Sequence, residues 1–282
     1  YHPTLVATGS PDVLIDALHS YSGTKCDLIY LPEVVRDSPT DSFIQQLAAR
    51  RGWLLNRVPS SRAPFLPLSG TWKDYLAGRS SNFRYTLKRK RKALSEHGPV
   101  SDQWFSSAEA VPELLRHIES IEEGSWKVAG DMAITRSQQE SSYHKLLLPW
   151  LARKGALAAN VLFVGQEPAA YSLCYKWNGR LAQAKTSFSE KFADCSPGLL
   201  VTAAAIERAH DLQLSEFDFL GDAMQHKATW TKSTRDHDHL YLYTSSLTAR
   251  VVGSLKKLVQ RMRRHEKQLT VGRSGMKDTS QH

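Results

Sequence analysis

The chain of 282 residues is basic, with 37 Lys and Arg residues against 28 Asp and Glu residues and a net charge of +9. Its hydrophobic content of 41% is ordinary for a globular protein, and no apolar run in the sequence is long enough to span a membrane. The three cysteines are odd in number and far apart, so they indicate reduced thiols in a cytoplasmic protein and not a disulfide framework or a zinc site, and the chain length suits one elaborated domain or two modest ones.

The positive charge is concentrated in two segments. Residues 79–92 contain seven basic residues and no acid, and residues 250–277 contain nine basic residues and one acid, Glu266. Because the rest of the chain is acidic on balance, the surface as a whole is not cationic. This clustering predicts anionic partners at two particular places.

The N-terminal part alternates between helical and extended patterns. Helices are predicted over residues 11–21 and 41–51, and short apolar strands over residues 27–31 and from residue 53 onward. This alternation favours an α/β arrangement. Three prolines in residues 59–67 then predict a loop.

A basic amphipathic helix is predicted over residues 82–94. Arg84, Lys88 and Arg91 follow one another at i, i+4 and i+7, so they lie along one face of this helix. We interpret the helix as an anion-binding element for phosphate groups of a cofactor, a lipid or a nucleic acid. The alternative is a solvated basic helix that binds nothing.

Two more helices, over residues 107–124 and 137–154, lead into an extended region. This region has the pattern of an antiparallel meander, because the dipeptide Asn178-Gly179 is a strong signal for a two-residue hairpin turn. The meander is predicted to contain three strands, over residues 158–164, 169–177 and 180–187.

A further helix begins at Ser196-Pro197-Gly198 and continues to about Asp211. Serine is a favoured N-cap residue and proline a favoured first helical residue, so the N–H groups of the first turn form a physical anion site. Later in the chain a basic helix is predicted over residues 247–268. Its part 250–264 interleaves apolar and charged residues, so it could lie on the inner face of an anionic membrane or dock on the protein itself.

Chemically interesting side chains follow the buried strand 216–220. The strand breaks at Gly221, and Asp222, His226 and Lys227 come next, beside Trp230. A strand that ends in this way often opens into the crevice of a site. The alternative is a solvated turn, with an exposed histidine and a tryptophan in the core.

The histidines of the sequence Asp236-His237-Asp238-His239 lie on one face of a predicted strand. No third ligand for a metal is evident nearby, so no metal site is predicted.

The order of these elements resembles the core of the GNAT acyltransferases. More closely, the chain is similar to the cellulose-biosynthesis-associated acetyltransferases of bacteria (the CelD/BcsL type), which are related to the Fem peptidyltransferases. One departure from their pattern is Gln225-His226, which replaces an acidic–aromatic pair before Lys227. The segments that carry the resemblance lie within about residues 70–243: the helix 82–94, Ser125-Trp126-Lys127, Ser196-Pro197-Gly198-Leu199-Leu200, and Phe217 to Asp222 with Lys227 and Trp230.

The resemblance implies an α/β (α+β) fold with a mixed, mostly antiparallel sheet flanked by helices. It further implies a partial N-terminal GNAT-like half over residues 1–70 and a GNAT acyltransferase domain over residues 71–245. The basic C-terminal helix and tail would occupy residues 246–282.

The resemblance also implies acyl transfer from acyl-CoA, such as acetyl-CoA, to an amine or hydroxyl of a sugar, a polysaccharide precursor or a related small acceptor, without a metal. The expected catalytic residues are Asp222, His226 and Lys227. Backbone groups of Lys185, Thr186 and Ser187 are expected near the thioester, and those of Ser196, Gly198, Leu199 and Leu200 near the pyrophosphate. The expected acceptor-binding residues are Trp126, Lys127, Trp230, Arg84 and Lys88.

Two other functions stay open. One is a Fem-like ligase dependent on aminoacyl-tRNA, although the absence of the long coiled-coil arm of many such ligases argues against a nucleic-acid partner. The other is a GNAT module without catalysis that binds an anionic polymer or a membrane surface through its basic helices.

Overall fold

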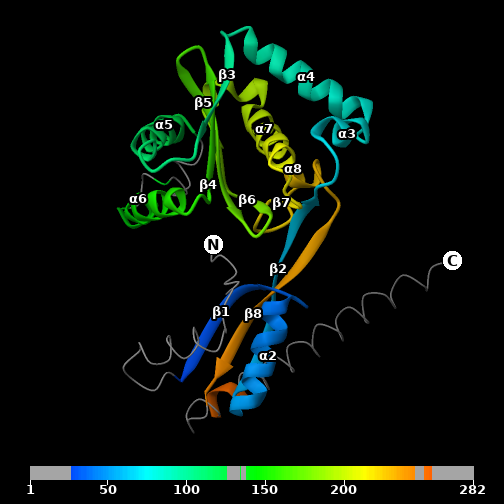
Figure 1. The fold of residues 1–282 in the computed structure, drawn as a ribbon, viewed down its shortest axis with the longest axis vertical. Helices are drawn as coiled ribbons and strands as arrows, with labels where there is room; N and C mark the ends of the chain where they lie inside the picture. The colour runs from blue at the N-terminus through cyan, green and yellow to red at the C-terminus, as the bar shows by residue number, and fades with distance from the viewer. Residues whose placement is uncertain (1–26, 126–133, 135–137, 245–250, 256–282) are drawn as a thin grey trace, which may run out of the picture. The chain divides into compact units, whose positions relative to one another are not determined.

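A computed structural model describes residues 27–125, 134, 138–244 and 251–255. Their strands form a mixed, mostly antiparallel sheet in the hydrogen-bonded order β1-β8-β2-β7-β6-β5-β4-β3, flanked by helices (Figure 1). The predicted α/β class is therefore confirmed. The described residues group into two compact units, a smaller one of residues 27–62, 235–244 and 251–255 and a larger one of residues 63–125, 134 and 138–234.

In the smaller unit, helix α2 packs against strands β1 and β8. The helix begins behind Ser38, whose hydroxyl accepts from the Asp41 N–H, and it ends at Gly52 in the left-handed conformation. Ile44 and Leu47 on its apolar face pack with buried residues of the strands. The elements of this unit are β1 (Leu28–Val35), α2 (Pro39–Arg51), the first part of β2 (Leu54–Pro67), and most of β8 (Thr234–Tyr243).

Strand β2 corrects the predicted proline loop, because the strand continues through residues 59–67. Proline has no N–H to donate, but its carbonyl can still accept: the Phe219 N–H donates to the Pro64 carbonyl at 3.2 Å. The predicted strand 27–31 is also longer than expected, because β1 includes Pro32. Its pairing with β8 shifts in register between Leu31 and Val34, and the strand then continues to Val35.

The larger unit contains the predicted meander, formed by the antiparallel strands β4, β5 and β6. Asn178 and Gly179 have φ values of 46° and 73°, as a type I′ hairpin turn requires. Strand β3, which pairs with β4, was not predicted. The elements are α3 (Trp72–Ala77), α4 (Ser81–Ser95), β3 (Val100–Phe105), α5 (Val111–Glu123), α6 (Gln138–Arg153), β4 (Leu157–Val164), β5 (Glu167–Trp177), β6 (Arg180–Phe188), the 3-10 helix η2 (Glu190–Cys195), α7 (Pro197–Asp211), β7 (Glu216–Asp218) and α8 (Gln225–Ala228).

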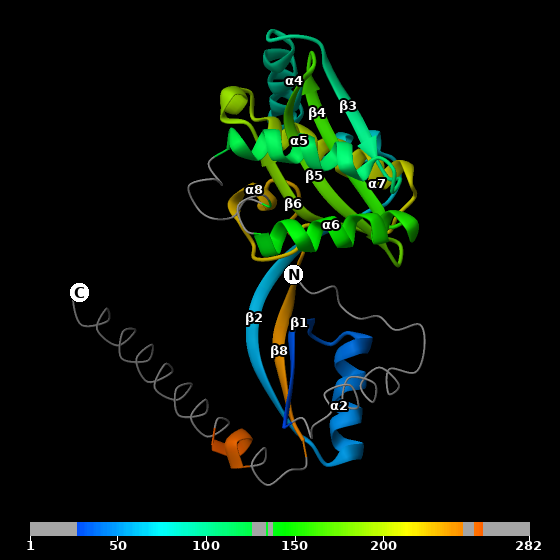
Figure 2. The same ribbon diagram turned by 90° about the vertical axis from the view of Figure 1, so that its left-hand side faces the viewer.

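Helices cover both faces of the meander, α5 and α6 on one side and α4 and α7 on the other (Figures 1 and 2). All eight residues of β4 are consequently buried. Val161 packs with Ile118 and Leu148 of α5 and α6, whereas its neighbour Leu162 packs with Val201 of α7. Because side chains alternate along a strand, β4 contributes residues to the core on each face of the sheet.

Some predicted elements cannot be compared. The helix over residues 11–21 and Cys26 lie outside the described residues, as does most of the predicted basic helix 247–268, of which residues 251–255 are described and helical. Within the described ranges, none of the helices has both the length and the apolar character that crossing a membrane would need.

Candidate active site

Strands β6 and β7 separate part-way along their length. They pair in parallel from Arg180 opposite Glu216 to Ala182 opposite Asp218, and β7 ends there. Strand β6 continues to Phe188 and remains paired with β5 on its other side. Residues 183–188 therefore have an edge without a strand partner in the described chain, which we call the open edge of β6. Backbone groups along such an edge can pair with the amides of a ligand.

A bulge in β6 lies where the two strands separate. Leu173 of β5 pairs with Lys185, and Cys174 pairs with Gln183, so Ala184 has no direct partner on β5. Bulges re-aim backbone groups and are frequent beside active sites. The segment from Lys185 to Ser187, whose backbone groups were expected near the thioester, thus begins directly after the bulge, where the direction of the N–H groups changes.

After β7 the chain leaves the sheet through a strained turn. Leu220 and Gly221 have φ values of 49° and 58°, and the left-handed conformation is unfavourable for leucine. The Leu220 N–H donates to Asp218 Oδ1 at 2.9 Å, while Lys227 Nζ donates to the carbonyl of Leu220 and, at 3.1 Å, to that of Asp222. The side chains of Asp218 and Lys227 thus both hold the strained turn in place. Backbone strain that is held in this way by surrounding groups often accompanies function.

The three predicted catalytic residues lie on this turn and on α8, which both views place near β6 (Figures 1 and 2). Partial burial lowers the pKa of Lys227, although the nearby carboxylates of Asp222 and Asp218 oppose this. Burial and the charge of Lys227 lower the pKa of His226. The arrangement favours a neutral imidazole, which can accept a proton.

The structure corrects the prediction that Trp230 stacks on an acceptor. Its side chain is only 2% exposed, and its ring packs edge-on against Phe83 with centroids 5.2 Å apart. The Tyr75 hydroxyl also donates to the Trp230 carbonyl at 2.8 Å. Trp230 therefore supports the end of the α8 segment from within the core.

Arg84 also has a structural role, since it does not point an unpaired charge outward from the basic helix α4. Its guanidinium donates to carbonyl oxygens at the end of α3 and just beyond, those of Leu76, Ala77 and Arg79. Lys88, in contrast, is exposed, together with Tyr85, Arg89 and Lys92 on the same face. Trp126 and Lys127 lie outside the described residues.

Helix α7 begins as predicted, with Ser196 at the N-cap and Pro197 first in the helix. The Ser196 side chain makes no capping hydrogen bond. The backbone carbonyl of Ser196 accepts from the Leu199 N–H at 3.0 Å. A Cβ on Gly198 would lie 3.2 Å from Cδ1 of Phe188, so glycine lets the helix start lie close against the end of β6. Of the predicted donors, the Leu199 N–H is thus already engaged within the helix.

A buried polar cluster, not predicted from the sequence, lies under the α5 face of β5 and β6. Glu122 is fully buried, and its carboxylate accepts from the Tyr171 hydroxyl and the Ile134 N–H, both at 2.6 Å. Lys185 Nζ lies 3.8 Å from the same carboxylate. Burial lowers the pKa of Lys185, although the negative charge of Glu122 acts in the opposite direction. The only sequence signal was an acid beside Ile121 in the apolar pattern of α5.

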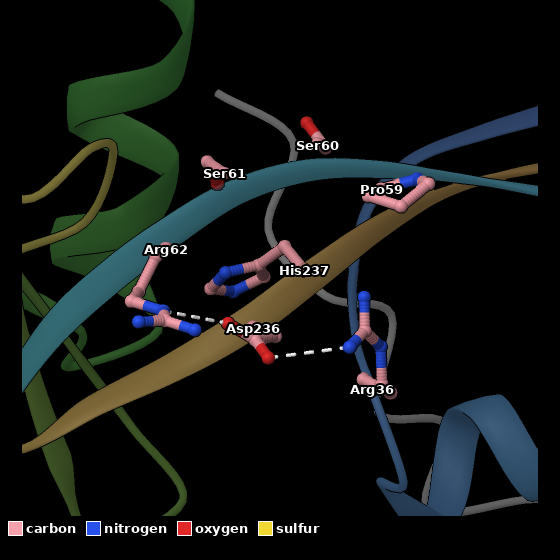
Figure 3. Close-up of a pocket in the computed structure, with 7 residues that line it drawn as sticks. All are labelled: Arg36, Pro59, Ser60, Ser61, Arg62, Asp236 and His237. Atoms are coloured by element: carbon pink, nitrogen blue, oxygen red, sulfur yellow. Dashed lines mark hydrogen bonds and ion pairs between the residues drawn. The ribbon is translucent and has the colours of Figure 1, made fainter. Parts of the chain in front are cut away.

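A shallow pocket of about 330 Å³ lies in the smaller unit (Figure 3). Arg36 and Arg62 both pair with Asp236, at 3.2 and 2.9 Å, and Arg36 also pairs with Asp238 at 2.7 Å. Both arginines that line this pocket are therefore engaged in ion pairs. Among the described residues, no group of three or more His, Cys, Asp or Glu side chains could hold a metal ion.

Comparison with known proteins places this chain in a family. The protein-family model for the acetyltransferase (GNAT) domain matches residues 81–228. A search of curated protein sequences gave no match.

The chain is similar in structure to the C-terminal domain of a protein assigned as a lysylphosphatidylglycerol synthetase from Agrobacterium fabrum, with a TM-score of 0.56 and 11% identity over 86% of this chain and 75% of that one. It is similar to FemX, with a TM-score of 0.56 and 11% identity over 83% and 76%. It is also similar to L-PGS from Bacillus licheniformis, with a TM-score of 0.52 and 10% identity over 89% and 78%. At these identities the likeness shows the fold alone.

Proposed function

Because the chain belongs to the family of GNAT acetyltransferase domains, we propose that it transfers an acyl group from acyl-CoA to an amine or hydroxyl acceptor. The observation that carries this proposal is the separation of β6 from β7 beside the bulge at Ala184. The acceptor class that we propose, a sugar, a polysaccharide precursor or a related small molecule, is supported by the resemblance to the CelD/BcsL type.

The described residues fit the two ends of an acyl-CoA molecule. The pantetheine arm contains amides, which can pair with the open edge of β6 as an added strand would. The pyrophosphate is anionic, and the start of α7 offers backbone N–H groups there, with Gly198 allowing a close approach to the end of β6. Lys185, Thr186 and Ser187 would thus act through their backbone, as the resemblance implies.

The residues of the turn and α8 would then carry the chemistry. Acyl-CoA supplies an activated thioester carbonyl, with the CoA thiol as the leaving group. His226 accepts the proton of the acceptor amine or hydroxyl as the acceptor bonds to the carbonyl carbon. Backbone N–H groups after the bulge stabilise the negative charge on the carbonyl oxygen. The carbon–sulfur bond breaks, and the proton that the departing thiolate takes up balances the one that His226 accepted, so the products are the acylated acceptor and the free CoA thiol.

Lys227 positions this machinery through the carbonyls of Leu220 and Asp222, and Asp222 is the alternative base. An anionic group on the acceptor would be attracted by the exposed cations of α4, among them Lys88. We retain Trp126 and Lys127 as acceptor contacts, since they follow the buried Ser125 at the end of α5. Gln225-His226 is the place where the acceptor contacts would differ from those of relatives.

Replacing Lys227 by methionine tests the proposal. The variant lacks the ammonium that holds two carbonyls of the strained turn, so kcat/KM should fall about 100-fold, as for other small misplacements of catalytic groups. Release of the CoA thiol would be followed with acetyl-CoA and longer acyl-CoAs against panels of amino sugars and amino acids. Lys232→Met, at an exposed lysine nearby, is the matched control. An equal loss in both variants, or no turnover with any acyl-CoA, would contradict the proposal.

A second candidate is a Fem-like ligase that takes its acyl group from aminoacyl-tRNA. It is favoured by the exposed cations Lys88, Arg89 and Lys92 of α4, since contacts with an RNA backbone need clustered Lys and Arg. Binding of tRNA that weakens steeply with salt, without any binding of acyl-CoA, would favour this candidate over the first.

A further inference from the structure

Helix α6 exposes a row of large apolar side chains. Tyr143, Leu146 and Trp150 are 48%, 76% and 45% exposed, and they follow one another at i, i+3 and i+7. This spacing places them along one side of the helix. The other side carries Leu148 and Leu151, which are buried in the core beneath it. The helix therefore has two apolar faces, of which only one packs against the described residues of the larger unit.

Trp177 extends this exposed row beyond the helix. It is 49% exposed, at the end of β5. Tyr175, two residues earlier, packs against the core beneath α6, so alternation places Trp177 on the same side of the sheet. The Lys176 N–H donates to the Ala156 carbonyl at 2.7 Å, which sets Trp177 next to the turn between α6 and β4. We call Tyr143, Leu146, Trp150 and Trp177 together the α6 face.

Cations without acidic neighbours in sequence surround the α6 face. Lys145, Arg153, Lys154 and Lys176 are exposed, and within the described residues none of them forms an ion pair. Residues 141–188 contain a single acid, Glu167, at the opposite end of β5. Glu140 lies in the first turn of α6, and Glu119 lines a pocket together with Lys145. The face therefore combines exposed aromatic and aliphatic side chains with an excess of positive charge around Arg153, Lys154 and Lys176.

We propose that the α6 face docks on the surface of a bilayer that contains anionic phospholipid, independently of the acyl transfer proposed above. Tryptophan and tyrosine prefer the level of the headgroups, and Leu146 would reach the acyl boundary. The lysines keep their charge at the phosphates while their methylene stems lie along apolar surface. This chemistry favours lipid over nucleic acid, because phosphate contacts alone give no reason to expose Leu146.

Flotation of the full chain with vesicles tests this docking. Vesicles of phosphatidylcholine with phosphatidylglycerol should bind the protein, vesicles of phosphatidylcholine alone should bind it weakly, and added salt should reduce binding. The double variant Leu146→Ser/Trp150→Ser should bind the anionic vesicles at least about tenfold more weakly, because it removes two side chains that would be buried in the bilayer. Both changes are on the surface, so circular dichroism should show an unchanged fold.

The matched control is Tyr85→Ser, at an exposed aromatic residue on the basic helix α4. This variant should bind the anionic vesicles as the unchanged protein does. Equal binding by the double variant and the unchanged protein would overturn the proposal, and so would equal weakening in the control. Absence of binding to anionic vesicles, with the double variant instead converting a dimer to a monomer, would assign the face to a second copy of the chain and also overturn it.

Discussion

Replacing His226 by glutamine is expected to lower kcat/KM for acyl transfer by about 10²–10⁴-fold, the range typical of a positioned general base. Glutamine keeps a polar side chain of similar length but cannot accept the proton of the acceptor. Binding of acyl-CoA should be unchanged, because the expected CoA contacts are on β6 and α7. The matched control is His97→Gln, at an exposed histidine just after α4, which should retain full activity.

The pH profile gives this prediction a second readout. Burial and the charge of Lys227 lower the pKa of His226 below its ordinary value of 6.5. The imidazole is therefore neutral, and able to act as a base, at every pH above that lowered value. For the unchanged protein, kcat/KM should rise with pH through an apparent pKa below 6.5 and then level off. This limb should disappear in His226→Gln. Full activity of that variant together with a large loss in Asp222→Asn would instead assign the base to Asp222.

Replacing Arg57 by methionine is expected to lower the free energy of unfolding by about 3–5 kcal/mol, the cost of breaking a buried ion pair from one side. Arg57 donates to both oxygens of Asp41, at 2.5 and 3.0 Å, and to Asp238 at 2.5 Å. Both carboxylates are fully buried. The variant leaves Asp41 without an arginine and Asp238 with Arg36 alone, so buried charge loses its compensation.

Arg62→Met is the matched control for that loss. Among the described residues, Arg62 forms an ion pair only with Asp236, and its side chain is 66% exposed, so its removal should cost less than about 1 kcal/mol. Urea denaturation of the full chains, followed by circular dichroism, would compare the two variants. Losses of equal size would show that the buried carboxylates are not the source of the effect.

Acid should weaken the same network. Burial alone would raise the pKa of Asp41, but hydrogen bonds from Arg57, the Asp37 N–H and Gln45 lower it overall, and the bonds from Arg36 lead the lowering of the pKa of Asp238. A lowered folded-state pKa contributes stability above the ordinary carboxyl pKa of 3.8, and this contribution is lost as the pH falls through the lowered value. The difference between the unchanged protein and Arg57→Met should therefore shrink in acid.

Local patterns were enough to predict α2, α4, α5, α6, α7 and the meander. The helix pattern at 41–51 became α2, and Asn178-Gly179 became the hairpin turn between β5 and β6, because capping and turn chemistry depend on residues close in sequence. The strand through Pro59 and Pro64 was missed for the opposite reason. Whether a proline is tolerated in a strand depends on whether its missing N–H would face a neighbouring strand and on which strand donates an N–H to its carbonyl. That neighbour is distant in sequence.

The sequence predicted which residues to propose for the site but not which of them have a structural role. Asp222 lies on the turn after β7, and His226 and Lys227 lie on α8, where the proposal assigns them the chemistry. Trp230 and Arg84 appear equally functional in the sequence, yet one fills the core and the other closes the end of α3. Glu122 was missed because its partners are on other elements of the fold.

The central claim is that acyl-CoA binds along the open edge of β6 and at the start of α7. Hydrogen–deuterium exchange of the full chain, with and without acetyl-CoA, tests this claim directly. The account predicts slower exchange for the amides of residues 183–188 and 198–200 when acetyl-CoA is present, and no change over residues 28–57. Unchanged exchange along β6, or protection confined to the smaller unit, would contradict it.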